Sequence, residues 1–158
     1  MSEKKLTHLN ADGQSHMVDV SDRDVTVRSA QASAHVKLSG EVISMLRDKS
    51  VPKGDVLATA RIAGIMGAKR TPELIPLCHP IALHSVTVDC EIDATGVAII
   101  AHVKTADRTG VEMEALTAAS VAALTVIDMV KAVDPSASIS FVQVDSKDGG
   151  RNGSWKRP

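Results

Sequence analysis

The chain has 158 residues, a formal net charge of −1 and 44% hydrophobic residues, which is the composition of one globular domain. A balanced charge argues against a general nucleic-acid binder, which usually carries a basic excess. One Phe, one Trp and no Tyr also leave almost no aromatic surface on which bases could stack. We therefore expect a single domain over residues 1–158 and a core of Ala, Val, Ile, Leu and Met.

The N-terminal sequence MSEKKLTHLN lacks the apolar run of a signal peptide. No stretch reaches the uninterrupted apolar length of a membrane span, so we expect a cytoplasmic protein with reduced thiols. Residues 1–15 and 148–158 are polar or Gly-rich, and we expect them to be flexible. Residues 16–20 form a short apolar island, which either docks on the body or forms a short strand.

Hydrophobic periodicity predicts the order strand, helical region, strand, strand, helix, strand. This β-α-β-β-α-β order is that of a ferredoxin-like α+β fold, an antiparallel sheet with helices packed on one face. Strands are expected within 25–38, 85–93, 97–105 and 139–145, and helices at 41–48, about 55–70 and 109–132.

The helix predicted at about 55–70 carries small residues along one face. Asp55 suits its N-cap, and Ala60, Gly64, Gly67 and Ala68 recur at helical spacing. Each glycine costs about 1 kcal/mol relative to alanine in a helix. The pattern therefore predicts close packing against another helix or the sheet.

The helix predicted from Thr109 to Ala132 is apolar except near its ends. Thr109 and Glu112 have the spacing of a capping box. Glu114 lies at the start and Asp128 at the end, fourteen residues apart, which is roughly 21 Å at ~1.5 Å per residue. One small substrate cannot reach both ends of a single helix, so two functional ends require a long substrate or a site that joins two chains.

Several ionisable groups lie in rigid or terminal settings, and each also has an ordinary structural explanation. Two prolines bracket Cys78 and His79 in the loop LIPLCHP (74–80), which presents both side chains; no third ligand is spaced to complete a metal site with them. Lys53 is either a solvated loop residue or functional. Asp128 and Lys131 are either a weak surface pair or a partly buried, reactive one.

Four motifs in this chain resemble the cyclic pyranopterin monophosphate synthase family. They are KGDVLATARIAG (53–64), LIPLCHP (74–80), TGVEMEALTAAS (109–120) and DMVKA (128–132). The resemblance runs from His16 to Gly150. It implies a lyase of molybdenum cofactor biosynthesis, which converts a cyclised dihydroguanosine triphosphate to cyclic pyranopterin monophosphate with release of diphosphate.

The resemblance also implies an assembly and a set of site residues. The subunit would be ferredoxin-like, and the assembly a hexamer built from dimers, with each site at a dimer interface. Asp128 would be the catalytic acid or base, Lys53 and Lys131 the proton-transfer lysines, and His79 a further catalytic residue. The substrate contacts would be Leu77, Cys78, His79, Glu112, Met113, Glu114, Lys147 and Arg28.

The expected partner is thus a small nucleotide-derived molecule, with neither nucleic acid nor a membrane involved. No resident cofactor or metal is implied, and whether Mg²⁺ accompanies the triphosphate stays open. Asp148 departs from the family pattern, because a carboxylate beside Lys147 weakens a phosphate contact. Arg108 stands where some relatives carry Lys, and it adds a cation close to the predicted phosphates.

Two other functions remain to be weighed against the synthase. A ligand-binding module of the same fold, such as a nucleotide sensor, would bind a guanine nucleotide without turnover. A scaffold protein would use its small-residue helix faces only to oligomerise, but it gives no reason for Lys53, His79 and Lys131 together. A nucleic-acid role ranks last.

Overall fold

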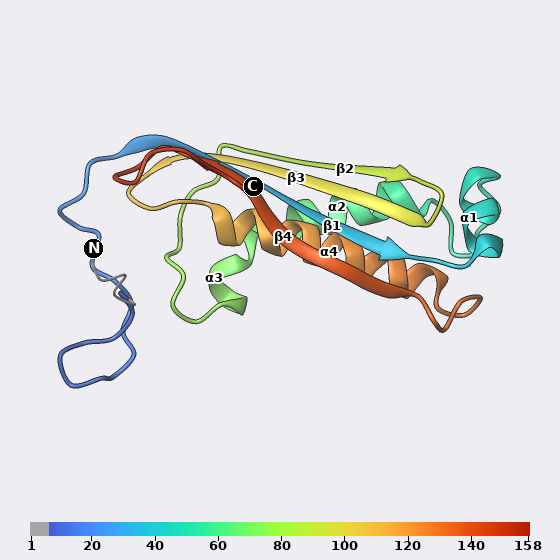
Figure 1. Cartoon of the computed structure of the whole chain (residues 1–158), viewed down its shortest axis with the longest axis horizontal. Helices are drawn as coiled ribbons and strands as arrows, with labels where there is room; N and C mark the ends of the chain where they lie inside the picture. Colours follow the sequence, from blue (N-terminus) through green and yellow to red (C-terminus); the bar gives the residue numbers. More distant parts are fainter. Residues whose placement is uncertain (1–6) are drawn as a thin grey trace.

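The computed structural model describes residues 7–158. Helices α2 and α4 lie along one face of an antiparallel sheet with the strand order β2-β3-β1-β4-β5 (Figure 1). The first four strands have the order and directions of the ferredoxin-like arrangement, so the predicted fold class is confirmed. The strands are β1 (Thr26–Lys37), β2 (Ser85–Ile92), β3 (Gly96–Asp107), β4 (Ser138–Asp148) and β5 (Trp155–Lys156), and the helices are α1 (Gly40–Arg47), α2 (Val56–Lys69), α3 (Thr71–Leu74) and α4 (Glu112–Val130).

The central strand β1 shows why the helices cover only one face. Ala32, Ala34 and Val36 are buried towards the helices, while the alternating residues Ser33 and His35 are half-buried on the other face. Helix α4, which packs against this surface and against α2, carries five completely buried alanines: Ala115, Ala118, Ala119, Ala122 and Ala123. Small side chains on both surfaces allow the helix to lie close to the sheet.

The small-residue face of α2 packs against α4, as predicted. A Cβ atom at Gly64 would lie 2.9 Å from the Ala118 carbonyl oxygen, and one at Gly67 would lie 2.8 Å from Cγ2 of Val121. Both distances are shorter than real Cβ contacts, so these positions require glycine for the two helices to meet. Asp55 caps α2 as expected, because its Oδ1 accepts from the Ala58 amide at 3.0 Å.

The capping box predicted for α4 is wrong. The N-cap residue is Val111, and no side chain caps the helix. The Glu112 carboxylate turns instead to Lys147 on β4, at 3.2 Å. The Glu112 carboxylate, which the local pattern assigned to the cap, therefore forms a long-range ion pair instead.

Helix α4 also corrects the expectation that no stretch is long enough to span a membrane. By length and composition alone it meets that criterion. In the fold, however, α4 packs beside α2 and against β1, β3 and β4 of the sheet. Buried residues occur from Glu114 to Val130, and burial changes only along one stripe of the helix, in which Glu114 and Thr117 are buried whereas Leu124 is 57% exposed.

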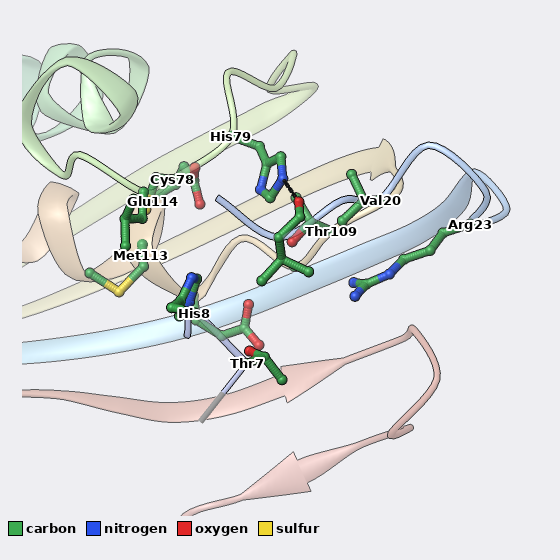
Figure 2. A pocket seen from close by; sticks show the side chains of 13 residues that line it. Thr7, His8, Val20, Arg23, Cys78, His79, Thr109, Met113 and Glu114 are labelled. Atoms are coloured by element: carbon green, nitrogen blue, oxygen red, sulfur yellow. Dashed lines mark hydrogen bonds between the residues drawn. The ribbon is translucent and has the colours of Figure 1, made fainter. Parts of the chain in front are cut away.

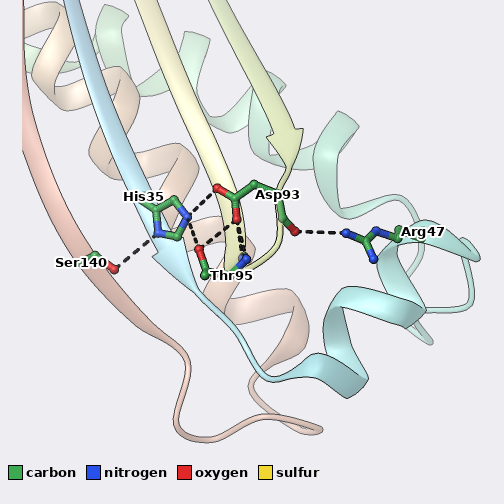
Figure 3. A network of polar contacts seen from close by, with 6 residues as sticks. His35, Arg47, Asp93, Thr95 and Ser140 are labelled. Atoms are coloured by element: carbon green, nitrogen blue, oxygen red, sulfur yellow. Dashed lines mark hydrogen bonds and ion pairs between the residues drawn. The ribbon is translucent and has the colours of Figure 1, made fainter.

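A polar network ties together the end of the sheet farthest from the N-terminus (Figure 3). His35 Nε2 lies 2.8 Å from Asp93 Oδ2, and its Nδ1 lies 3.4 Å from the Ser140 hydroxyl. The Asp93 carbonyl accepts from Arg47 at 3.3 Å. Hydrogen bonds from the Thr95 backbone, and then from His35 and the Thr95 hydroxyl, lower the pKa of Asp93 to about 2. The network joins β1, β4, α1 and the β2–β3 turn.

Both ends of the chain form some backbone pairing within the described residues. Residues 1–6 lie outside the described part, whereas Leu9 and Ser15 form a β-bridge. The apolar island 16–20 docks on the body and forms no strand. At the other end β5 pairs with β4, with Trp155 opposite Lys147. The flexibility of these segments in solution stays a prediction.

Candidate active site

Lys53, Asp128 and Lys131 form one cluster at the C-terminal end of α4. Asp128 Oδ1 accepts from Lys131 Nζ at 2.6 Å, and Lys53 Nζ donates to the Asp128 carbonyl at 2.8 Å. The Lys131 hydrogen bond is the main reason that the pKa of Asp128 is lowered, and Lys53 adds to it. The side chains of Lys53 and Lys131 are 46% and 59% exposed, so neither lysine is buried within a single chain.

A cavity of about 220 Å³ lies at the opposite end of α4. Figure 2 shows side chains from the loop before β2, from the start of α4 and from the N-terminal segment lining it. Six of the predicted substrate contacts belong to its wall: Leu77, Cys78, His79, Glu112, Met113 and Glu114.

Glu114 has the most strongly altered chemistry in this cavity. The residue is only 3% exposed. Burial, with a smaller contribution from the nearby Glu112 carboxylate, raises the pKa of Glu114 to about 7. A carboxyl group that titrates near neutral pH can both accept and release a proton. The sequence had identified Glu114 only as a substrate contact.

Cys78 and His79 have more limited chemistry. Burial, and then the charge of Glu114, raise the pKa of the Cys78 thiol, which therefore stays neutral and is a poor nucleophile at neutral pH. His79 Nε2 lies 2.6 Å from the carbonyl oxygen of Val18, and this bond is the dashed line at His79 in Figure 2. A carbonyl oxygen only accepts, so Nε2 carries the proton and Nδ1 is the ring nitrogen left for other chemistry.

A second cavity, of about 240 Å³, adjoins the first and is rich in cations. Both cavities are lined by Arg23, Thr109, Gly110 and Glu112. The second also contains two predicted contacts, Arg28 and Lys147, which share it with Arg151, Asp148 and residues 149–150. Four cationic side chains therefore face two carboxylates, and the N-terminal end of α4 adds backbone amides that favour an anion.

Two consecutive glycines shape the wall of the second cavity. Gly149 and Gly150 have φ angles of +91° and +79°, a region that other residues rarely adopt. A Cβ atom at Gly150 would lie 2.4 Å from a terminal nitrogen of Arg28. The glycines thus allow the backbone to approach the Arg28 guanidinium, and together the two cavities suit a ligand with one ring and several phosphates.

Comparison with known proteins identifies the family. A model of the MoaC family matches residues 17–150. The chain belongs to the MoaC family. A relative from Streptomyces avermitilis named "Cyclic pyranopterin monophosphate synthase" is 60% identical, over 99% of this chain and 92% of the relative. Relatives of the same name from Streptomyces griseus and Nocardioides sp. are 62% and 57% identical, over 99% of this chain and 88% and 98% of theirs. The resemblance seen in the motifs is thereby confirmed.

The structure of this MoaC-family chain gathers the predicted site residues into two groups. All eight predicted substrate contacts line the adjoining cavities. The cluster of Lys53, Asp128 and Lys131 stands apart, because Glu114 and Asp128 are separated by fourteen residues of one helix, roughly 21 Å. Within one chain the two groups cannot act on the same small molecule.

The sequence missed the contribution of the N-terminal segment. Thr7, His8 and Arg23 line the first cavity, and only the polar character of this segment was visible beforehand. Arg108 lines neither cavity; its Nε donates to the carbonyl oxygen of Arg23 at 3.0 Å. Within residues 7–158, no group of three or more His, Cys, Asp or Glu side chains is placed to hold a metal ion.

Proposed function

We propose that this chain is a cyclic pyranopterin monophosphate synthase, a lyase of molybdenum cofactor biosynthesis. Its substrate would be a cyclised dihydroguanosine triphosphate, and its products cyclic pyranopterin monophosphate and diphosphate. The observation that carries the proposal is the 57–62% identity, over nearly the full chain, to relatives of that name. A cytoplasmic location goes with this biosynthetic role.

The two cavities offer separate places for the two halves of the substrate. The first combines apolar side chains such as Leu77 and Met113 with Glu114 and His79, and suits the purine-derived ring. The second, with Arg28 and Lys147, suits the phosphates, because cations stabilise the negative charge on the departing diphosphate. With so few aromatic residues in the chain, hydrogen bonds rather than stacking would hold the ring.

The proton transfers would fall to the Lys53, Asp128 and Lys131 cluster and to Glu114. Rebuilding the ring and closing the cyclic phosphate both require groups that gain and lose protons near neutral pH. Asp128 contacts both lysines and so holds them in place. The raised pKa of Glu114 makes it the complementary acid or base at the ring end of the site.

A second copy of the chain would bring the separated groups together. If two α4 helices packed antiparallel about a two-fold axis, the Glu114 end of one would lie beside the Asp128 end of the other. Large apolar side chains on α4 and on the neighbouring α2 are available for such contact, since Leu124 on α4 is 57% exposed and Ile62 and Met66 on α2 are 60% and 50% exposed. This supports a homo-oligomer with shared sites; the hexameric assembly is proposed from the family resemblance alone.

The direct test of the function is to measure diphosphate release and pterin formation in parallel, using the cyclised dihydroguanosine triphosphate and the purified chain. We expect both products at equal rates. Tight binding without diphosphate would contradict the synthase and favour a sensor. If the chain neither bound nor converted the substrate, only the scaffold function would remain.

The lysines have a test of their own. We expect Lys53→Ala and Lys131→Ala to abolish turnover while the far-ultraviolet circular dichroism stays that of the wild type, because both side chains are exposed and contribute little to stability. Near-normal turnover in either variant would remove that lysine from the mechanism.

A further inference from the structure

The N-terminal segment 7–23, which we call the arm, is folded against the first cavity. Its tip is a small hairpin, in which Asn10 Oδ1 accepts from the amides of Asp12 and Gln14 at 3.0 and 2.8 Å. The His16 amide donates to the His8 carbonyl at 2.9 Å and closes the hairpin. These bonds give the arm a defined shape, so it can place particular side chains.

Two side chains from different loops hold the arm by its backbone. His79, in the loop before β2, donates to the Val18 carbonyl at 2.6 Å. Arg108, in the β3–α4 loop, donates to the Arg23 carbonyl at 3.0 Å. The arm is therefore fastened at two points five residues apart, beside the cavity that both loops border.

The arm forms much of the wall of this cavity. It supplies five of the thirteen lining residues, so opening the arm would expose the ring end of the site to water. His8 and Met113 both line the cavity, and in Figure 2 the Arg23 side chain extends towards its interior. The five arm residues are Thr7, His8, Val18, Val20 and Arg23.

Arg23 is the arm residue best placed to contact a phosphate. It lines both the ring cavity and the cationic cavity, and so stands where the two halves of a nucleotide would meet. Asp22 and Asp24 flank it and line a neighbouring hollow with it. Among the ion pairs and side-chain hydrogen bonds formed within residues 7–158, none involves the Arg23 guanidinium. Its donors are thus available for the bidentate contact that arginine makes with phosphate.

We propose that the arm is a strap that closes over the bound nucleotide, with Arg23 as a phosphate-contacting residue. His79 and Arg108 are positioning residues that fasten the strap, and His79 acts through Val18 in addition to its contact with the substrate. The identity of the substrate rests on the proposed function. The strap itself requires only a ligand with a purine-type ring and phosphates.

The experiment uses guanosine triphosphate as a stable probe and the full-length chain. Binding is measured by calorimetry, and amide hydrogen exchange is followed at Gln14 and His16, whose bonds hold the hairpin. We expect the probe to slow exchange at both amides. Arg23→Gln should weaken binding roughly 10- to 100-fold, the range for a hydrogen bond to a charged group. Lys104→Gln, which removes the same charge from an exposed position on β3, should change binding less than about twofold.

The fastening is tested with two substitutions of His79. His79→Leu should speed exchange of the arm amides and weaken probe binding, whereas His79→Gln keeps an N–H donor and should restore part of the protection. Equal binding by Arg23→Gln and Lys104→Gln would overturn the strap. Unchanged arm exchange in His79→Leu, or no binding of the probe to the wild type, would overturn it as well.

These results are separable from a failure of the proposed function. If the wild type released no diphosphate from the cyclised substrate, the synthase would be refuted, while probe binding and arm exchange would still report on the strap. If the wild type turned over normally and Arg23→Gln had the same KM, the enzyme would stand and the strap would be refuted.

Discussion

At the scale of single residues, the chemistry of the site depends on what surrounds each group. Glu112 and Glu114 are two residues apart in sequence, yet Glu112 pairs with Lys147 at 3.2 Å whereas Glu114 is 3% exposed. Burial without a cation raises the pKa of Glu114. The sequence predicted that both glutamates belong to the site. It could not predict that one is ion-paired and the other buried, because the Lys147 partner and the surrounding residues are distant in sequence.

Glu114 should make the stability of the protein depend on pH. Its folded-state pKa of about 7 exceeds the ordinary value of 4.5, so the folded state binds the proton more tightly. The resulting stabilisation is complete below pH ~4.5 and is lost as the pH rises through 7. In the wild type, the free energy of unfolding should therefore fall as the pH rises, and in Glu114→Gln this fall should be smaller by roughly 1–3 kcal/mol. Urea unfolding between pH 4 and 8, at fixed protein concentration, checks this; parallel curves for variant and wild type would contradict it.

The Gly149–Gly150 turn makes a second prediction at this scale. Gly150→Ala should displace Arg28 and weaken binding of guanosine triphosphate several-fold, because the new Cβ would lie 2.4 Å from the guanidinium. Gly153→Ala is the matched control: its φ is also positive, at +62°, but nothing lies within 4 Å of the added atom. Equal losses of affinity in calorimetry would show that backbone strain, rather than the Arg28 contact, is responsible.

At the scale of elements, local patterns predicted the body of the fold better than its ends. The alternation in the strands extends over many positions, and so do the small residues on α2. A prediction from such a pattern does not depend on any single residue. The start of α4 was mispredicted, because a single residue, Glu112, decided the capping box and a contact with β4 overrode it. The arm was missed for a similar reason: its fastening depends on His79 and Arg108, which are distant in sequence.

The packing of α2 against α4 can be tested at Gly64. Gly64→Ala gains about 1 kcal/mol of helix propensity. The added Cβ would, however, lie 2.9 Å from a backbone oxygen of Ala118 and 3.1 Å from Val88, so the helices must move apart. We expect a net loss of about 1–2 kcal/mol. Gly40→Ala, whose Cβ would meet nothing within 4 Å, should change the free energy of unfolding by less than about 0.5 kcal/mol. A Gly64→Ala variant as stable as wild type would contradict the close packing.

At the scale of the whole molecule, one long helix keeps two reactive groups apart. The separation followed from the sequence alone, since the rise per residue of a helix is fixed. What the sequence did not reveal is that both lysines are half-exposed, so that within one chain their surroundings are largely water. The large apolar side chains of Ile62, Met66 and Leu124 are exposed as well, and both observations agree with the proposal that a second copy completes the site.

The measurement that tests a shared site most directly is complementation between two inactive variants. Lys131→Ala removes the lysine end of the site and Glu114→Gln the carboxyl end. If each site combines the two ends from different copies, mixing the variants after subunit exchange restores one intact site in every mixed dimer. We predict that activity rises to about a quarter of the wild-type value, since half of the dimers are mixed and half of their sites are intact. Activity that stays at the level of the separate variants, although exchange is shown by mass spectrometry, would contradict the shared site.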